Sequence, residues 1–427
     1  MSIVTEPIML NKTGLQIVDA LNYIGKQVGV ENQIWGFIED NDILDPGKRI
    51  TYIGNAVGKV PMTIEDAATG KVNEGTWGDF IEMLDNHPWM VDFNGVPDYR
   101  LRDDDYTKKL DGTASDVSNT NYKGGAYAWI RRIYKSETTM GSKRIVSFSF
   151  TKHDNYEPIG FVDSDNNVLE GVWIPMFYGS PDGNGKMRSL AGMQPSYNHD
   201  TNYEHTAISA CGARHRFYGG GIAKTLEDIE IMLCKSSNVP GVIGTGNCSG
   251  YNTAATPAGT NGVLANAVLG NGRWFGTTTG KQLNKYFHSI VLGSYQQWMR
   301  DPYCLLVNGE YKVSKNYTYD LSGNSFEATG IKLPESGGPF YPHFYKTIPG
   351  FGSVPINSDG YKGSTSLGGC DGLWVNISGV MVSLRFGCCD YGLIDGPRFL
   401  FVSAGAGAAS WYVGAADLLL PPAGVSA

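Results

Sequence analysis

Apolar and polar residues alternate with different periods along the chain, and the first regular pattern, in residues 15–28, is helical. Its apolar positions are spaced alternately by four and three residues: Ile17, Leu21, Ile24 and Val28. This spacing places them on one stripe of a helix, which either packs on its own domain or forms a short coiled-coil seam between subunits. We therefore predict an N-terminal helix within an attachment or oligomerisation segment at residues 1–45.

The next part of the chain has short alternating runs between many turn formers. Residues 49–53 alternate as a strand does, and residues 103–121 are rich in Asp, Thr, Ser and Asn, which is typical of a linker. The pattern predicts a small β-rich adaptor and linker over residues 46–122.

Beyond residue 122 the pattern predicts longer strands and two helices. The predicted strands cover residues 126–134, 144–150 and 168–177. One helix is expected from Thr225, which forms a capping-box-like start with Asp228, and the other over residues 281–291. Long segments rich in Gly, Asn and Ser lie at 244–272 and 323–368, and they cannot all be regular structure. These elements indicate an α+β fold with long loops.

The segment from Arg385 to Val413 follows neither the helical nor the strand period. Turn formers and one large aromatic residue recur in it and just after it as a fixed frame: Gly387, Gly392, Gly396, Pro397, Trp411 and Gly414. Such a frame fixes the path of the backbone and leaves the residues between it free, which suits a displayed surface. The aromatic residues there are either half-buried strand residues or recognition residues, and as a set they favour recognition.

Composition narrows the classes of partner. The net charge of −8 argues against binding to nucleic acid or to anionic membrane surfaces, and leaves protein and carbohydrate partners open. Many Gly and Tyr residues with only 18% charged residues favour strands and polar loops. The N-terminus does not resemble a secretory signal, and the sequence contains no run of apolar residues long enough to cross a membrane.

The sequence has few candidate residues for catalysis or metal binding. The seven cysteines have no metal-ligand spacing, so we expect mostly free thiols, and no histidine pair has the spacing of a zinc protease. Cys388 and Cys389 are the candidates for a redox pair, but neighbours in a strand point to opposite faces. The clusters at 163–167 and 182–184 lack the full pattern of a calcium loop. We expect no catalysis, no cofactor and no metal.

Two stretches resemble a known family. Residues 287–298, FHSIVLGSYQQW, resemble a segment of the C-type-lectin-like fold of formylglycine-generating-enzyme relatives, with Gly293 and Trp298 at the matching frame positions. Residues 368–374 and the closing segment are similar to the variable region of phage proteins diversified by retroelements. The resemblance covers about residues 125–420 and implies a C-type-lectin-like ligand-binding domain at 123–427, with a variable region at about 384–414.

In that family, randomised adenines in the template make some positions variable while the frame residues persist. Carried over position by position, the resemblance assigns these ligand-binding positions: Phe386, Cys388, Asp390, Tyr391, Asp395, Arg398, Phe401, Ala404, Ala408, Ser410 and Tyr412. It assigns Trp411 to the scaffold.

The resemblance implies a phage virion protein of the tail tip or tail fibre, assembled in the host cytoplasm, that binds a host-cell surface protein or glycan. It also implies a homotrimer that contacts other virion tail proteins. The alternative is a structural virion protein, such as a baseplate or capsid decoration, whose lectin-like domain serves assembly.

Overall fold

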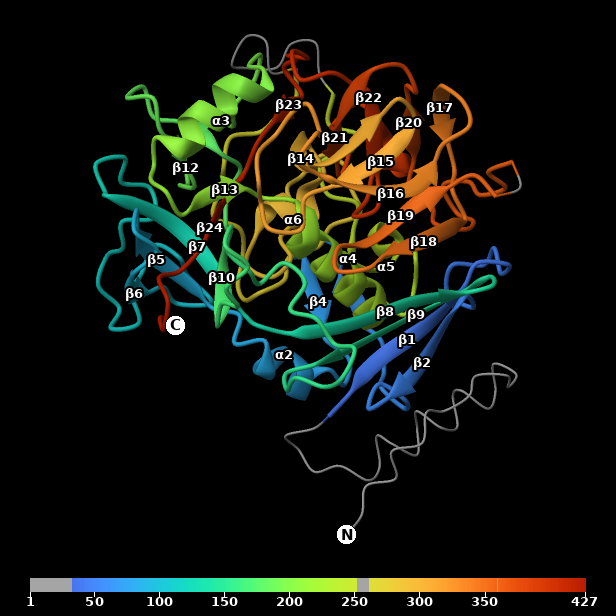
Figure 1. The fold of residues 1–427 in the computed structure, drawn as a ribbon. Coiled ribbons are helices and arrows are strands. Elements are labelled where there is room, and N and C mark those ends of the chain that lie inside the picture. The colour runs from blue at the N-terminus through green and yellow to red at the C-terminus, as the bar shows by residue number, and fades with distance from the viewer. Residues whose placement is uncertain (1–32, 252–260, 359) are drawn as a thin grey trace.

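The computed structural model describes residues 33–251, 261–358 and 360–427, and strands dominate its regular structure (Figure 1). The described part is mostly sheet with few helices, which confirms the β-rich α+β class. The helix predicted at residues 15–28 lies outside the described residues.

An antiparallel sheet of four strands begins the described chain. Its strands, in the order β2-β1-β9-β8, are β2 (Ile50–Gly54), β1 (Trp35–Asp40), β9 (Lys143–Ser149) and β8 (Tyr134–Met140). The predicted alternation is seen in β9, where Val146 and Phe148 are buried opposite Phe37 and Trp35 of β1. The strand predictions at 49–53 and 144–150 are therefore confirmed.

A second antiparallel sheet combines the last strand of the chain with earlier strands. Its order is β13 (His215–Phe217), β24 (Asp417–Leu419), β10 (Gly171–Pro175), β7 (Gly124–Arg131), β5 (Pro88–Asp92) and β6 (Pro97–Arg100). The predicted strand at 168–177 contains β10, and the one at 126–134 overlaps both β7 and the start of β8. The last strand of the chain, β24, thus lies between β13 and β10, whose residues come much earlier in the sequence.

The third sheet carries the closing segment of the chain. Its order is β16 (Glu327–Lys332), β15 (Glu310–Val313), β14 (Trp298–Val307), β21 (Val380–Arg385), β22 (Leu400–Ala404), β20 (Leu373–Val375) and β17 (Gly337–Phe340), and β23 (Val413–Gly414) pairs with β14. The pairs β20–β22 and β14–β23 are parallel, and the others are antiparallel. The region 323–368, predicted not to be regular throughout, contains β16 and β17 of this sheet together with loops.

Short hairpins and helices complete the described part. The hairpins are β3 (Thr63–Asp66) with β4 (Lys71–Asn73), β11 (Ser180–Pro181) with β12 (Met187–Arg188), and β18 (Phe344–Ile348) with β19 (Gly352–Ile356). The helices are α2 (Gly78–Met83), α3 (Thr201–Ser209), α4 (Gly220–Cys234), α5 (Val239–Ile243), α6 (Ile290–Ser294) and the 3-10 helix η2 (Gly392–Ile394).

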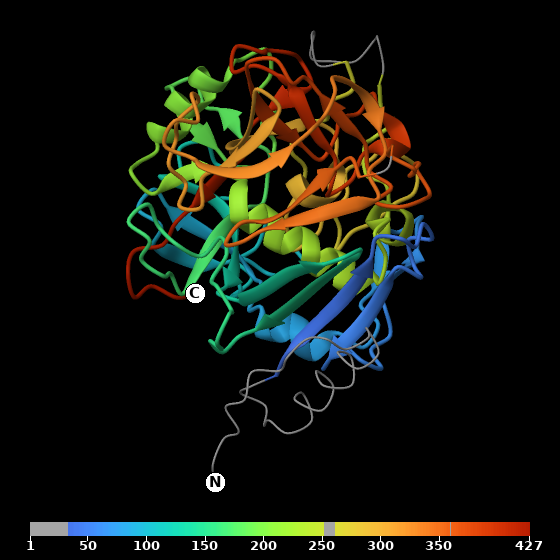
Figure 2. The ribbon, with the colours of Figure 1, turned by 45° about the vertical axis from the view of Figure 1, so that its right-hand side comes forward.

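Helix α4 is the centre of the molecule. Figures 1 and 2 place it between the four-stranded sheet and the sheet that contains β14, and all 15 of its residues are buried. The helix begins at Gly220, five residues before the predicted start, because the carboxylate of Asp301 in β14 accepts a hydrogen bond from the Gly220 amide at 2.9 Å. The capping box predicted at Thr225 and Asp228 is wrong, since both side chains bind distant groups.

The helix predicted at residues 281–291 is also wrong over most of its length. Only α6 is helical there, and it starts at Ile290. Phe287 and His288 have positive φ angles of 52° and 63°, which a right-handed helix does not contain.

Two of the sheets cross the predicted boundary at residue 122. Strand β1 pairs with β9, and β5 pairs with β7, so residues on both sides of this position share hydrogen-bond ladders. Within the predicted linker at 103–121, Tyr106 and Val117 belong to the main hydrophobic core. The change in composition therefore marks a polar loop packed on the sheets, and the sheets are continuous across it.

Candidate functional site

The closing segment, residues 385–414, lies across the sheet that contains β14, as expected of a scaffold for a surface. Strand β21 ends at Arg385, η2 follows, and β22 returns antiparallel to β21 with Phe401 opposite Leu384. The backbone amide of Trp298, at the start of β14, donates to the carbonyl of Tyr412 at 2.9 Å, just before β23. Both ends of the segment are thus fixed to strands.

The frame glycines lie where no side chain would fit. A Cβ atom on Gly396 would collide with the carboxylate of Asp371, and one on Gly387, whose φ is 112°, would collide with Asp395. A Cβ on Gly414 would stand 2.7 Å from the side-chain oxygen of Gln297, and one on Gly293 would stand 3.0 Å from a backbone nitrogen. The fixed path of the backbone therefore depends on glycine at these positions.

The other frame residues differ in their surroundings. Gly392 opens η2 with a φ of 72°, and Pro397 is buried. Trp411 is half-exposed and contacts Tyr251 and Tyr412, with ring centroids 5.6 and 4.6 Å away. The side chain of Trp411 is therefore held against two tyrosine rings and is only partly covered.

Four of the predicted ligand-binding residues lie inside the protein. These side chains are at most 2% exposed, so they cannot contact a ligand at the surface: Phe386, Cys388, Asp395 and Arg398. Their assignment to the recognition surface is wrong. We refer to these four residues as the inner set.

A buried ionic network explains the position of Arg398. Its guanidinium donates two hydrogen bonds to Glu39 of β1, at 2.6 and 2.7 Å. Burial alone would raise the pKa of Glu39, but attraction from Arg398, Arg49 and Arg144 lowers it well below its usual range. Arg398 is therefore a structural residue that links the closing segment to the first sheet.

The network continues through α4. Asp228 accepts hydrogen bonds from Lys135 of β8 and Arg144 of β9, at 2.5 and 2.6 Å, and Glu227 accepts one from Arg385 of β21 at 2.7 Å. Buried charges need such partners because their desolvation is costly. These pairs connect α4 to the sheets on both of its sides.

Other predicted ligand-binding residues form an aromatic patch. Tyr391, Phe401 and Tyr412 are half-buried and surround the buried Trp298, with ring centroids 4.9, 4.5 and 5.0 Å from it. Trp374 of β20 lies beside them, 6.1 Å from Tyr391 and 6.2 Å from Phe401. We call Trp374, Tyr391, Phe401 and Tyr412 the aromatic patch.

The patch has properties of a recognition surface. Its rings rest on a fixed indole, so little conformational entropy is lost when a ligand packs on them. Burial raises the pKa of the Tyr391 phenol, which keeps it a neutral group able to donate a hydrogen bond. The sequence identified three of the four residues of the patch, and it missed Trp374, which β20 brings in through parallel pairing with β22.

The remaining predicted positions are at or near the surface. Asp390 is exposed, and Ala404, Ala408 and Ser410 are half-buried. Ala404 also packs against the cluster that contains Trp298. With Tyr391, Phe401 and Tyr412, these residues form the outer set of predicted positions.

The cysteines confirm the expectation of free thiols. All seven lie in the described part of the chain, and all are buried and unpaired. Burial raises the pKa of both Cys388 and Cys389, so these thiols stay protonated and are poor nucleophiles.

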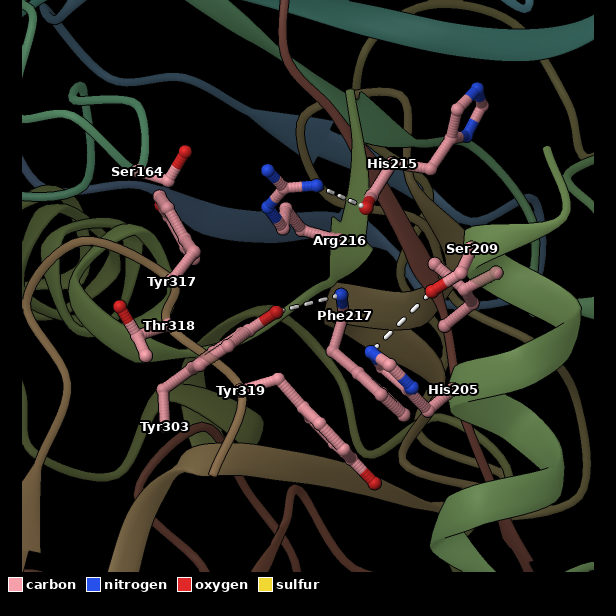
Figure 3. A pocket seen from close by; sticks show the side chains of 11 residues that line it. Ser164, His205, Ser209, His215, Arg216, Phe217, Tyr303, Tyr317, Thr318 and Tyr319 are labelled. Atoms are coloured by element: carbon pink, nitrogen blue, oxygen red, sulfur yellow. Dashed lines mark hydrogen bonds between the residues drawn. The ribbon is translucent and has the colours of Figure 1, made fainter. Parts of the chain in front are cut away.

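A separate cavity of about 320 Å³ lies between α3, β13, β14 and residues 317–319 (Figure 3). His205 stacks on Tyr319 with 3.6 Å between ring centroids, and the hydroxyl of Tyr303 accepts the Phe217 amide at 3.1 Å. None of the predicted site residues lines this cavity. The residues that line it come from segments far apart in the chain, so a local sequence pattern could not predict it.

Comparison with known proteins gives no relative: no protein-family model matches the chain, and a search of curated proteins found no similar sequence. Among the described residues, no helix combines the length and apolar character needed to cross a membrane.

Proposed function

We propose that the chain is a receptor-binding protein of a phage virion, placed at the tail tip or in a tail fibre, and that the aromatic patch contacts a host-cell surface molecule. The observation that carries the proposal is the group of partly exposed, partly buried rings held on Trp298 between backbone segments fixed by glycine. Aromatic groups of this kind supply large contact area and dominate the binding energy of many interfaces.

The resemblance to retroelement-diversified proteins supports the same proposal. It assigns a C-type-lectin-like fold to residues 123–427 and ligand contact to the closing segment, whose outer set is exposed at Asp390 and half-buried elsewhere. We propose that diversification, where it occurs, acts on the outer set. A reverse-transcriptase gene and a near-identical repeat beside this gene would support diversification, and the absence of both would remove that part of the proposal.

Competition for host cells tests receptor binding directly. The purified chain should occupy receptors and reduce phage adsorption, and Tyr391→Ala or Tyr412→Ala should weaken this competition by roughly 30-fold, as loss of an aromatic anchor does in other interfaces. Tyr122→Ala is the matched control, because Tyr122 is half-buried beside another sheet and pairs with Asp98. Equal competition by all variants would contradict the role of the patch.

Phage carrying the same substitutions separate the receptor role from the structural alternative. Intact particles that no longer adsorb would support receptor binding, whereas failed assembly would support a baseplate or decoration protein. A homotrimer, which the family implies, would strengthen weak single contacts through avidity. Light scattering that gives a monomer at micromolar concentration would contradict the trimer.

A further inference from the structure

Three side chains outside the aromatic patch converge as potential metal ligands. Cys211 follows α3, His215 opens β13 and Asp417 opens β24, and each offers a ligand atom within 4.8 Å of the other two. All three side chains are buried, at 4%, 3% and 0% exposure. A thiolate, an imidazole and a carboxylate are the donors that zinc accepts in proteins.

The orientation of the His215 ring suits a metal ligand. Nε2 lies 3.0 Å from the carbonyl oxygen of Phe93, and Nδ1 faces a carboxylate oxygen of Asp417 at 2.7 Å. A ligating histidine usually donates its other N–H to a carbonyl or carboxylate, which fixes the tautomer and the ring. The Phe93 carbonyl can accept the Nε2 proton, and Nδ1 can bind a metal ion when its hydrogen bond to Asp417 is replaced by bonds of both groups to that ion. His215 also lines the cavity of about 320 Å³, but in Figure 3 its ring points away from Tyr303 and Tyr319.

Asp417 also has a free position for a cation. The hydroxyl of Tyr127 donates to Oδ2 at 2.6 Å, whereas Oδ1 is buried and has no hydrogen-bond partner among the described protein groups. A buried carboxylate oxygen without a partner is costly, and a bound cation would remove that cost.

The charges around the three ligands are compatible with a divalent ion. Lys186 and Arg188 stand over the ring of Phe93, 4.0 and 5.2 Å from its centroid, and would repel a cation with uncharged ligands. A thiolate and a carboxylate together carry two negative charges, which neutralise Zn²⁺ within the site. A site with the thiolate of Cys211 can therefore form beside these two cations.

We propose that Cys211, His215 and Asp417 bind one zinc ion, and that this ion ties the end of α3 and strand β13 to the last strand of the chain. These three residues supply three of the four positions of the tetrahedron. The ion has a structural role, because its ligands are buried and come from segments about 200 residues apart. The role is independent of receptor binding.

Metal analysis of the whole chain tests the proposal. The protein is produced with added zinc and purified without chelators or a metal-affinity step, and its zinc is measured by mass spectrometry. The expected result is about one zinc per chain, as structural sites hold zinc tightly. Replacement by cobalt should give the near-ultraviolet absorption of a thiolate bound to Co²⁺.

Variants show whether these residues hold the ion. Cys211→Ser and Asp417→Asn should lose the zinc and the cobalt absorption, whereas Cys248→Ser, which changes another buried cysteine, should keep both. Wild-type protein that holds no zinc and gains no cobalt absorption would overturn the proposal. Full zinc content in folded Cys211→Ser would also overturn it. If Cys211→Ser does not fold, the wild-type cobalt spectrum decides the question alone.

Discussion

The inner and outer sets belong to one irregular segment, yet their surroundings are opposite. The inner set is buried, and one of its members, Arg398, binds Glu39 of the ionic network. The outer set is at or near the surface, and three of its members pack on Trp298. Residues of both sets lie in a sequence without helical or strand period. A lack of helical or strand period therefore does not show that a segment is displayed.

The difference has a physical cause. Interior positions are usually apolar, which gives buried strands a recognisable pattern. Here Glu39, Glu227 and Asp228 bring charge into the interior, and the segments packed on them supply arginines at positions where apolar residues are expected. Each set should therefore respond differently to substitution.

The largest effect is expected for Arg398→Ala. This change leaves Glu39 buried with one partner fewer, and breaking a buried ion pair costs about 3–5 kcal/mol in the free energy of unfolding. Urea denaturation measures the loss. Arg102→Ala is the control, because Arg102 pairs with Asp104 at the surface, and its midpoint should equal that of the wild type. Equal midpoints for both variants would refute the structural role of Arg398.

Gly396→Ala should have the next largest effect. The added Cβ would collide with the carboxylate of Asp371, and overpacking of this kind costs about 1–3 kcal/mol. Gly407→Ala adds the same methyl group in the same segment where no atom lies within 4 Å. Thermal denaturation should therefore separate the two variants, with only Gly396→Ala melting at a lower temperature.

The buried carboxyl groups predict how stability depends on pH. Burial raises the pKa of Asp371 to about 8, although its carboxylate accepts the Arg398 amide at 2.6 Å. The unfolded chain loses this proton near pH 4, so the folded state binds more protons between about pH 4 and 8. The contribution of Asp371 to stability is thus fully present below that window and is lost as the pH rises through it.

Asp371→Asn should therefore flatten the profile of stability against pH. The asparagine oxygen can still accept the Arg398 amide, and the slope contributed by one proton is roughly 1 kcal/mol per pH unit. Urea midpoints between pH 5 and 7 measure the slope. Glu230 and Asp395, whose pKa values burial also raises, leave a residual slope in the variant. Parallel profiles for wild type and variant would contradict the assignment.

The sequence predicts those strands and helices that are determined by the pattern of side chains within the element itself. The alternation of Val146 and Phe148 predicts β9, and the stripe at Leu226, Ile229 and Leu233 predicts the body of α4. The start of α4 is not predictable locally, because its cap is Asp301 from β14, 81 residues from Gly220. A hydrogen bond to a residue so distant in the sequence cannot be predicted from the residues around Gly220.

The site follows the same rule. The sequence indicates three rings of the aromatic patch because they lie in one segment, and it misses Trp374, which only the sheet brings beside them. Likewise, the sequence does not indicate Cys211, His215 and Asp417 as a group, because Asp417 joins the other two only through the pairing of β13 with β24.

The smallest effect on stability is expected for a substitution in the outer set. Measured beside a substitution in the inner set, it tests directly whether the two sets differ in their tolerance of new side chains. The carbonyl of Ser410 accepts the Asn198 amide at 2.9 Å, a backbone contact that Ser410→Asn leaves intact. Unfolding should change by within about 0.5 kcal/mol, as at ordinary surface positions. Cys388→Asn places the same amide group at a fully buried position of the inner set and should destabilise the protein clearly. If the urea midpoints of Ser410→Asn and Cys388→Asn fall by equal amounts, the two sets do not differ in tolerance. The outer set would then not be a surface on which ligand contacts can change without loss of stability.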